Sequence, residues 1–193
     1  MERILFLRKF LKYGLHIASI TPSSRALSEA VVANINWERA EVIVELGAGT
    51  GPITEAILSR ARPSCRVIAI ERDPDFISVL KRRFAGQSNL EIVESPVRDL
   101  AAVLKHRGVE AVDYIVSGLP IPSFTPLEQR ALFADMRIVL SEHGAFSQIT
   151  EIPLIYWSFY KQFFENVGFK FVPWNIPPGG VYFCSGLKDS ARS

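Results

Sequence analysis

The chain has 193 residues, of which 48% are apolar and 22% charged, so it can bury a core and is too apolar to be disordered. Its net charge of +2 is uneven, because residues 1–25 hold five bases and one acid while the remainder is mildly acidic. This distribution disfavours a broad nucleic-acid-binding face. Two distant cysteines, Cys65 and Cys184, lack metal-ligand spacing and predict reduced thiols in a cytoplasmic protein without a structural metal.

Residues 2–17 predict an amphipathic helix at the amino terminus. Its broad apolar face includes Phe6 and Phe10, and its other face carries Arg8, Lys9 and Lys12. Such a helix either lies in a membrane interface, with its cations on anionic headgroups, or packs on its own domain with a solvated basic face. Composition alone leaves both alternatives open.

The segment 42–58, VIVELGAGTGPITEAIL, organises the chain. It predicts a β-branched strand, a turn through Gly47, Gly49 and Gly51, and a helix that ends before Pro63. Glycines allow a backbone to approach a ligand closely, and a helix start offers free N–H groups. A second predicted strand, 66–70, is followed by Glu71, an acid that can accept hydrogen bonds from both hydroxyls of a ribose.

This pattern predicts a nucleoside-cofactor site but does not match every nucleotide motif. The glycine spacing differs from the dinucleotide G-x-G-x-x-G pattern, and no Lys-Ser or Lys-Thr pair follows as in a P-loop. Another nucleotide, or a site that has lost its ligand, remains an alternative at this point.

The rest of the chain alternates between predicted strands and helices. Further strands are expected at 90–93, 112–116, 144–150, 169–173 and 181–185, and helices at 25–35, 53–61, from Pro74 onward with Asp73 as its N-cap, 97–105, 127–139 and 154–167. Regular alternation predicts a parallel sheet with helices on both faces. The short Pro-Gly loop at 177–180 makes the last strand antiparallel, since parallel neighbours need a longer crossover. The polar tail, 189–193, is expected to be loose.

Several segments together resemble one enzyme family. The glycine motif ELGAGTGP with Glu71 resembles motif I of class I S-adenosylmethionine (SAM) methyltransferases. With FLRKFLKYG, TPSSRAL, IERDP, SGLPIPSF, SQIT and NIPPGGVY, nearly the whole chain resembles the bacterial phospholipid N-methyltransferases, relatives of the rRNA adenine dimethyltransferases. The resemblance implies a Rossmann-like α/β fold with a seven-stranded, mostly parallel sheet and an antiparallel last strand. It also implies SAM as cofactor, with ligands bound outside the carboxyl ends of the strands.

The resemblance also implies a domain plan and a cellular location. Residues 1–20 would anchor the protein to an anionic membrane surface through Phe6, Arg8, Lys9, Phe10 and Lys12, residues 21–188 would form the methyltransferase domain, and 189–193 the tail. The protein would then be cytoplasmic and peripheral at the inner face of the membrane. No obligate protein partner, nucleic acid or metal is implied.

Two departures from the family pattern affect the expected site. After the third strand the family usually carries Gly-Asp-Ala, whose acid contacts the adenine amino group, whereas this chain has Ser95-Pro96-Val97. The adenine would then be held by the backbone, by Ser95 or by Asp99. After the fifth strand the family ends Q-F-T-Y, and here Glu151 takes the place of the aromatic residue, which makes an aminoacyl lipid of the ornithine type a credible substrate.

The candidate site residues follow from these motifs. The expected cofactor-binding residues are Glu45, Gly47, Ala48, Gly49, Thr50, Gly51, Glu71, Arg72, Ser95, Val97, Ser117 and Gly118. Methyl transfer to an amine requires alignment and removal of a proton, and the candidates for these roles are Ser117, Glu151, Tyr156 and Tyr182. Each also has a structural interpretation, as a turn cap, a solvated acid or a packed aromatic ring.

The predicted function is SAM-dependent N-methylation of a membrane lipid amine, phosphatidylethanolamine towards phosphatidylcholine, with the ornithine-type lipid as the alternative. An rRNA adenine dimethyltransferase would carry an Asn-[Leu/Ile]-Pro-[Phe/Tyr] motif whose aromatic ring stacks on a flipped base. The chain has Gly118-Leu119-Pro120-Ile121 there, and the family's basic RNA-binding domain is missing. A non-catalytic SAM-binding module is a third possibility.

Overall fold

The computed structural model describes residues 25–175 and 178–188. The expected amphipathic helix, the TPSS segment, Pro177 and the tail 189–193 therefore lie outside the described residues. Among those described, no helix is both long and apolar enough to cross a membrane.

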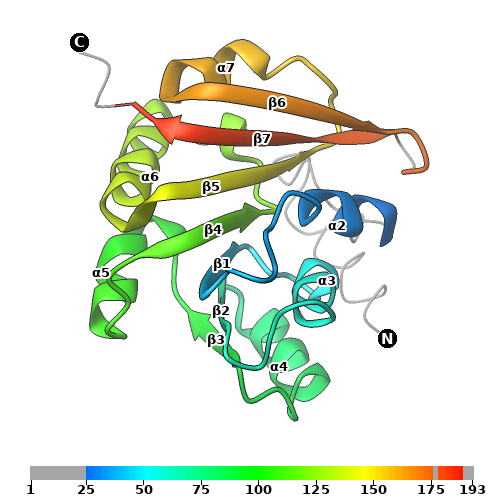
Figure 1. Cartoon of the computed structure of the whole chain (residues 1–193), viewed down its shortest axis with the longest axis vertical. Helices are drawn as coiled ribbons and strands as arrows, with labels where there is room; N and C mark the ends of the chain where they lie inside the picture. The colour runs from blue at the N-terminus through cyan, green and yellow to red at the C-terminus, as the bar shows by residue number, and fades with distance from the viewer. Residues whose placement is uncertain (1–24, 176–177, 189–193) are drawn as a thin grey trace.

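The described elements alternate as expected from the sequence (Figure 1). The helices are α2 (Arg25–Val31), α3 (Pro52–Leu58), α4 (Pro74–Arg83), η2 (Val97–Asp99), α5 (Leu100–His106), η3 (Ile121–Ser123), α6 (Pro126–Val139) and α7 (Trp157–Phe163). The strands are β1 (Val42–Leu46), β2 (Arg66–Glu71), β3 (Leu90–Glu94), β4 (Val112–Ser117), β5 (Leu140–Thr150), β6 (Phe164–Val172) and β7 (Gly179–Leu187).

The seven strands form one sheet in the order β3-β2-β1-β4-β5-β7-β6. Strands β3, β2, β1, β4 and β5 pair in parallel, and β7 is antiparallel to both β5 and β6. The fold class predicted from the sequence is therefore confirmed, including the reversed last strand.

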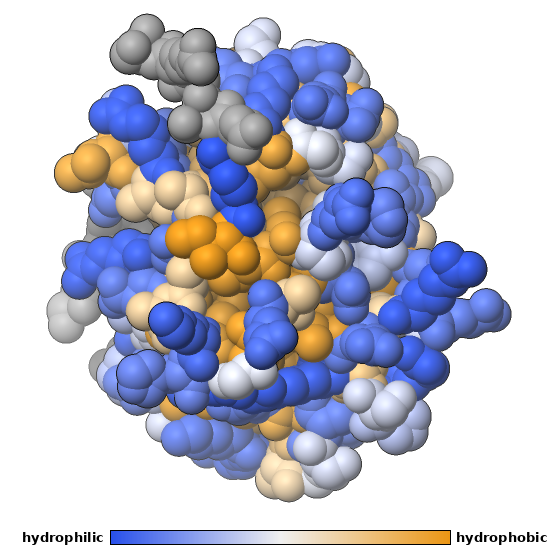
Figure 2. Space-filling view, turned by 60° about the vertical axis from the view of Figure 1, so that its left-hand side comes forward, coloured by the Kyte–Doolittle hydropathy of each residue, from blue (hydrophilic) through white to orange (hydrophobic). Residues whose placement is uncertain are grey.

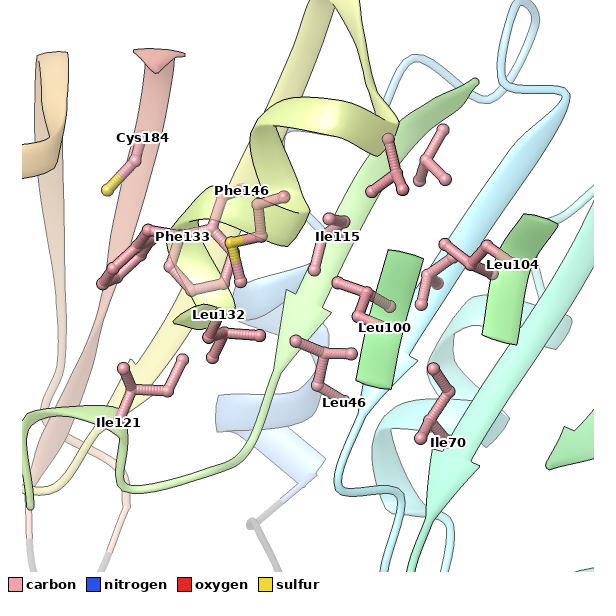
Figure 3. Close-up of a cluster of buried hydrophobic side chains, with 14 of the residues drawn as sticks. Leu46, Ile70, Leu100, Leu104, Ile115, Ile121, Leu132, Phe133, Phe146 and Cys184 are labelled. Carbon is pink, nitrogen blue, oxygen red and sulfur yellow. The ribbon is translucent and has the colours of Figure 1, made fainter. Parts of the chain in front are cut away.

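Helices cover both faces of the sheet, and the hydrophobic core lies between the helices and the sheet. On one face, α5, α6 and α7 pack on β4, β5 and β7, where Phe133 and Phe146 meet edge to face at 6.4 Å (Figure 3). On the other face, α2 packs on β5, β6 and β7, and α3 packs beside it on β2. On the side of the molecule shown in Figure 2, apolar side chains gather in the middle and hydrophilic ones surround them.

Local capping explains where α4 begins. The side chain of Asp73 accepts a hydrogen bond from the Asp75 backbone N–H at 2.9 Å, and Pro74 occupies the first helical position. Both were predicted from the sequence, since proline loses no hydrogen bond at that position.

The predicted helix at 154–167 is wrong at both ends. Helix α7 spans only Trp157–Phe163, and Phe164 already begins β6, where Val167 pairs with Cys184 of β7. The segment is apolar nearly all round, so its periodicity could not separate a buried helix from a buried strand.

The fifth strand begins earlier than expected. It starts at Leu140, directly after α6, and its register with β4 shifts between Val112 and Tyr114. A Cβ at Gly144 would lie 3.0 Å from the Val112 carbonyl oxygen. Glycine therefore permits the irregular pairing here, although the sequence suggested that it marked the start of the strand.

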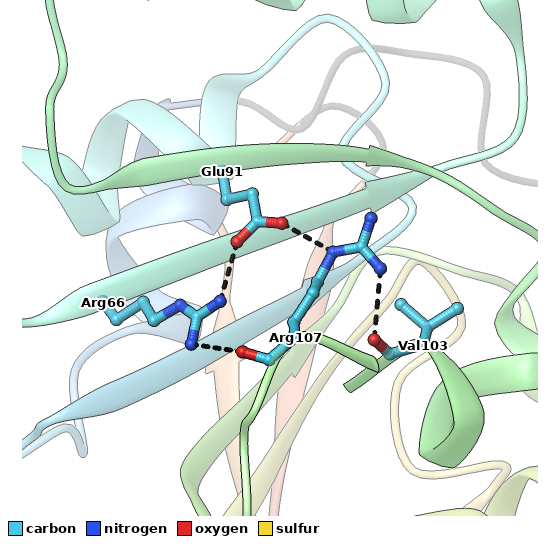
Figure 4. A network of polar contacts seen from close by, with 4 residues as sticks. All are labelled: Arg66, Glu91, Val103 and Arg107. Carbon is cyan, nitrogen blue, oxygen red and sulfur yellow. Dashed lines mark hydrogen bonds and ion pairs between the residues drawn. The ribbon is translucent and has the colours of Figure 1, made fainter. Parts of the chain in front are cut away.

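A carboxylate between two arginines ties β2, β3 and the end of α5 together (Figure 4). Glu91 accepts hydrogen bonds from Arg66 at 2.9 Å and from Arg107 at 2.6 Å, while Arg66 also donates to the Arg107 carbonyl at 3.0 Å. Burial alone would raise the pKa of Glu91, but the two guanidinium groups outweigh burial and lower it.

We expect Glu91→Gln to destabilise the fold by about 1 kcal/mol at neutral pH, a modest value because all three side chains are partly exposed. The folded carboxyl has a lowered pKa, so its contribution is complete above the unfolded pKa of about 4.3 and is lost as pH falls. Urea unfolding should therefore show that the difference in unfolding free energy between wild type and variant is smaller near pH 4 than at neutral pH. The exposed Glu110→Gln serves as control, and an equal loss there would contradict the assignment.

Candidate functional site

The carboxyl ends of the central strands lie level with one another. Leu46 at the end of β1 pairs with Ile70 on one side and Ser117 on the other, and Ser117 pairs with Gln148. Gln148 in turn pairs with Tyr182 of β7. The loops after β1, β2, β4 and β5 therefore leave the sheet at a common edge, hereafter the carboxyl edge.

The glycine turn after β1 needs its glycines for two separate reasons. Gly47 and Gly51 have φ values of 75° and 88°, which L side chains rarely adopt. A Cβ at Gly47 would lie 2.3 Å from the Leu119 side chain, and one at Gly51 would lie 2.6 Å from the Phe84 ring. Around Gly49, by contrast, no atom lies within 4 Å of the Cβ position, so open space adjoins the middle of the turn.

Neighbouring elements hold the turn in place. The Gly47 N–H donates to the Ile70 carbonyl at 2.8 Å, the Gly51 N–H donates to the Ala48 carbonyl at 2.9 Å, and Arg83 of α4 donates to the Thr50 carbonyl at 2.7 Å. Ala48 and Thr50 are themselves buried. Sequence reasoning missed Arg83, because nothing in the spacing between residues 50 and 83 indicates that the two would meet.

The carboxylate of Glu71 joins the end of β2 to the glycine turn. One oxygen accepts the Gly49 N–H at 2.9 Å, and the other accepts the Arg72 and Asp73 N–H groups at 2.8 and 3.0 Å. Arg72 takes part in this arrangement only through its backbone N–H group, because its side chain is exposed. An acceptor thus lies beside the open space at Gly49.

Glu45 of β1 is a fully buried carboxylic acid. The Thr54 hydroxyl of α3 donates to Oε2 at 2.6 Å, whereas Oε1 has no hydrogen-bond partner within the described part of the chain. Burial raises the pKa of Glu45 to about 7, opposed by the Thr54 hydrogen bond and reinforced by the nearby charge of Glu71. Sequence reasoning found Glu45 but not Thr54.

The segment after β3 lies next to Glu71. The Ser95 N–H donates to the Glu71 carbonyl at 3.0 Å, its hydroxyl donates to the Pro96 carbonyl at 3.1 Å, and Val97 begins η2. Asp99 is exposed at the end of that turn. The Ser95 hydroxyl already has a partner, so its expected contact with an adenine ring stays a prediction.

Ser117 and Gly118 lie where β4 ends. The Gly118 N–H donates to the Leu46 carbonyl at 3.2 Å, and the buried Ser117 hydroxyl accepts the Leu119 N–H at 3.1 Å, as a turn cap does. Gln148, a residue that the site prediction missed, donates from its amide to the Leu119 and Ile149 carbonyls, each at 2.8 Å. The turn after β4 is therefore held from both neighbouring strands.

The remaining candidates lie around the loop after β5. Glu151 follows Thr150 directly and is half-buried, and burial raises the pKa of its carboxyl. The Tyr182 hydroxyl is buried and accepts the Tyr156 N–H at 3.1 Å, so this pair fixes the loop. A direct role in chemistry for Ser117, Glu151, Tyr156 or Tyr182 stays a prediction.

These features fit a ligand with hydroxyl groups and a positive charge. A nucleoside that bears an ammonium group would match them. Its hydroxyl groups could donate to Glu71 beside the open space at Gly49, and its ammonium group could donate to the Glu45 oxygen that has no partner among the described residues.

Comparisons with known proteins identify the family. The model of a methyltransferase domain matches residues 43–144. An ornithine lipid N-methyltransferase of Singulisphaera acidiphila is 55% identical over 186 residues, covering 96% of this chain and 97% of the relative. A probable ribosomal RNA small subunit methyltransferase A of Methanococcoides burtonii is 32% identical over 117 residues, and the match spans only 42% of its length.

Solved structures with low sequence identity share the fold. Human methyltransferase-like protein 13, solved in complex with SAH, superposes with a TM-score of 0.62 at 16% identity, over 92% of this chain and 84% of the other. Phosphoethanolamine N-methyltransferase 1 of Haemonchus contortus superposes with a TM-score of 0.67 at 14% identity, over 100% of this chain and 51% of the other. The chain belongs to the class I SAM-dependent methyltransferases, because the family model, the relative that matches over 97% of its length and the order of the strands all indicate this family.

Proposed function

We propose that the protein transfers methyl groups to the free amine of an ornithine-type aminoacyl lipid at a membrane surface. The observation that carries this proposal is the 55% identity to the Singulisphaera ornithine lipid N-methyltransferase, which extends over nearly all of both chains. It favours the ornithine-type headgroup over phosphatidylethanolamine, the first expectation from the sequence. Ribosomal RNA is disfavoured, since the rRNA-modifying relative is 32% identical over 117 residues of this chain, against 55% over 186 for the ornithine lipid enzyme.

The residues that would hold the cofactor are those of the glycine turn and the two buried acids. Glu71 would accept hydrogen bonds from the ribose hydroxyls, and Glu45, oriented by Thr54, would meet the methionine ammonium group. Bound SAM supplies an activated methyl group on a sulfonium. Ser95, Val97, Ser117 and Gly118, which follow or end β3 and β4, would border the same site.

Glu151 is the residue that we assign to the headgroup amine. An attacking amine must be neutral, so a base must accept its proton, and a carboxyl whose pKa is raised by burial accepts a proton more readily near neutral pH. Before attack, the same carboxylate would pair with the protonated amine and help to orient it.

The membrane would be reached from the cytoplasmic side. The expected anchor residues Phe6, Arg8, Lys9, Phe10 and Lys12 lie outside the described residues, so this part of the proposal rests on their amphipathic pattern.

The decisive experiment offers labelled SAM to the protein with vesicles that contain ornithine lipid, with vesicles that contain phosphatidylethanolamine, and with ribosomal RNA. We expect label in the ornithine lipid, resolved by chromatography of the chloroform phase. Glu151→Gln should lower kcat by about a hundredfold if the carboxylate is the base, whereas the exposed Glu142→Gln at the other end of β5 should not. Label confined to phosphatidylethanolamine or to RNA would overturn the proposal.

Loss of the ribose acceptor should weaken the cofactor complex. We expect Glu71→Ala to reduce SAM affinity by at least about 1–3 kcal/mol, the range for losing hydrogen bonds to a charged group, as measured by titration calorimetry. Glu41→Ala, which removes an exposed acid at the other edge of the sheet, is the control and should leave SAM affinity unchanged. Unchanged affinity in a folded Glu71→Ala protein would contradict the assignment.

The protonation of Glu45 should make cofactor affinity depend on pH. With a pKa of about 7 the free protein holds this carboxyl mostly protonated at pH 6, while a neighbouring ammonium group favours the ionised form. Binding should therefore release a proton, and affinity should rise by up to about tenfold per pH unit as pH increases towards 7. Calorimetry in buffers of different ionisation enthalpy measures this release, and Glu45→Gln should abolish it. A wild type that releases no proton would disprove the coupling.

A further inference from the structure

The most exposed large apolar side chains of the described residues gather at one edge of the sheet. Seven such residues are exposed. One of them, Ile138 in the last turn of α6, lies at the opposite end of the sheet from the carboxyl edge, where the parallel strands begin (the amino edge). The other six belong to the carboxyl edge: Leu127, Ile152, Leu154, Ile155, Phe171 and Trp174. Five of them, which we call the apolar rim, come from the loop after β5 and from the end of β6 (Ile152, Leu154, Ile155, Phe171 and Trp174).

The sheet register brings the two halves of the rim together. Thr150 at the end of β5 pairs with Gly180, which pairs with Phe171 of β6. Two strand spacings are about 10 Å, so the loop that begins at Glu151 leaves the sheet about 10 Å from Phe171. Figure 1 shows both segments at the same end of the sheet, to the right of β5 and β6.

The backbone holds the rim open to solvent. The Thr150 hydroxyl contacts both the N–H and the carbonyl of Ile152, at 3.1 Å each, and the Tyr182 hydroxyl accepts the Tyr156 N–H. Between these two attachments Leu154 has a φ of 64°, a conformation that costs a residue with a Cβ about 1–2 kcal/mol. Ile155, next to the strained residue, nevertheless remains 66% exposed, so the strain does not bury it, and Trp174 in the other half of the rim is 85% exposed.

The charge pattern suits a lipid surface. No charged residue occurs from 152 to 160 or from 171 to 187. At the carboxyl edge, Glu151 precedes the first of these segments and Lys170 precedes the second, whereas Lys161 and Lys188 contact each other at the opposite end of β6 and β7. Phe171 and Trp174 also border a groove of about 540 Å³ between α2 and the end of β6, whose charged lining residues are Lys170 and the ion pair of Glu29 with Arg60. Apolar side chains with an exposed tryptophan and an adjacent lysine match the chemistry of a membrane interface.

We infer that the apolar rim inserts into the membrane and sets the carboxyl edge of the sheet against the headgroups, in addition to any anchoring by the amino-terminal segment. This inference rests on the proposed function, which places the substrate amine in a bilayer. Glu151 directly precedes the rim, so insertion of Ile152 and its neighbours brings that carboxylate to the depth of the headgroups.

The test uses the full chain and vesicles of phosphatidylcholine and phosphatidylglycerol whose acyl chains carry bromine, a contact quencher of tryptophan. We expect vesicles to quench the emission of the wild type and to shift it to shorter wavelength, and we expect Trp174→Phe to lose most of that response. Trp37 and Trp157, which are half-buried, remain in both proteins.

A variant of the apolar rim tests how much the rim contributes to the free energy of membrane binding. Ile155→Ser combined with Trp174→Ser should lower partitioning onto the same vesicles by about tenfold or more, the factor associated with withdrawing one large apolar side chain from the membrane. Ile138→Ser, which removes an equally exposed isoleucine (70%) at the amino edge, should partition as the wild type does. The rim variant should methylate lipid in vesicles poorly and a dispersed short-chain analogue normally.

Three results would overturn the inference. Equal quenching in wild type and Trp174→Phe would show that Trp174 stays in water, and unchanged partitioning of the rim variant would show that the rim contributes no affinity. A wild-type dimer that the rim variant converts to a monomer, without change in partitioning, would assign the rim to self-association instead. If the wild type fails to methylate even the dispersed analogue, the proposed function fails, while the quenching result still decides whether the rim inserts.

Discussion

The cofactor half of this protein depends on one carboxylate that collects backbone N–H groups from two loops. Glu71 accepts from Gly49 in the turn after β1 and from Arg72 and Asp73 in the turn after β2. These donors would otherwise be unsatisfied at the end of a parallel sheet, where each strand leaves the hydrogen-bonded ladder. The same acid that suits a ribose therefore also fixes the relative position of the loops that would surround it.

The sheet divides into two parts that present different groups at their carboxyl ends. Its parallel part, from β3 to β4, presents the glycine turn and the buried acids, and its mixed part, from β5 to β6, carries the loop with Glu151 and the apolar rim. Ser117 and Gln148 meet where the two parts join, and the Gln148 amide holds the Leu119 carbonyl of the β4 turn. The cofactor and the substrate would therefore meet at the boundary between β4 and β5.

The sequence predicted local structure well wherever a residue type had a local reason to be there. The Asp73 cap, Pro74 at the helix start and the glycine turn all follow from backbone chemistry that neighbouring residues fix. The boundary between α7 and β6 was missed, because a segment buried on all sides shows no period. Arg83, Thr54 and Gln148 were missed because their partners are chosen by packing between distant segments, which a single sequence does not reveal.

The loop after β5 owes its path to hydroxyl groups and to one strained residue, and not to the side chains that it exposes. Thr150 and Tyr182 fix its two ends, while Ile152, Leu154 and Ile155 bury too little surface to define its shape. Substitutions in the loop can therefore accumulate during evolution with little penalty to the fold. A family built on this loop could change the headgroup that it accepts while keeping the same sheet and the same cofactor.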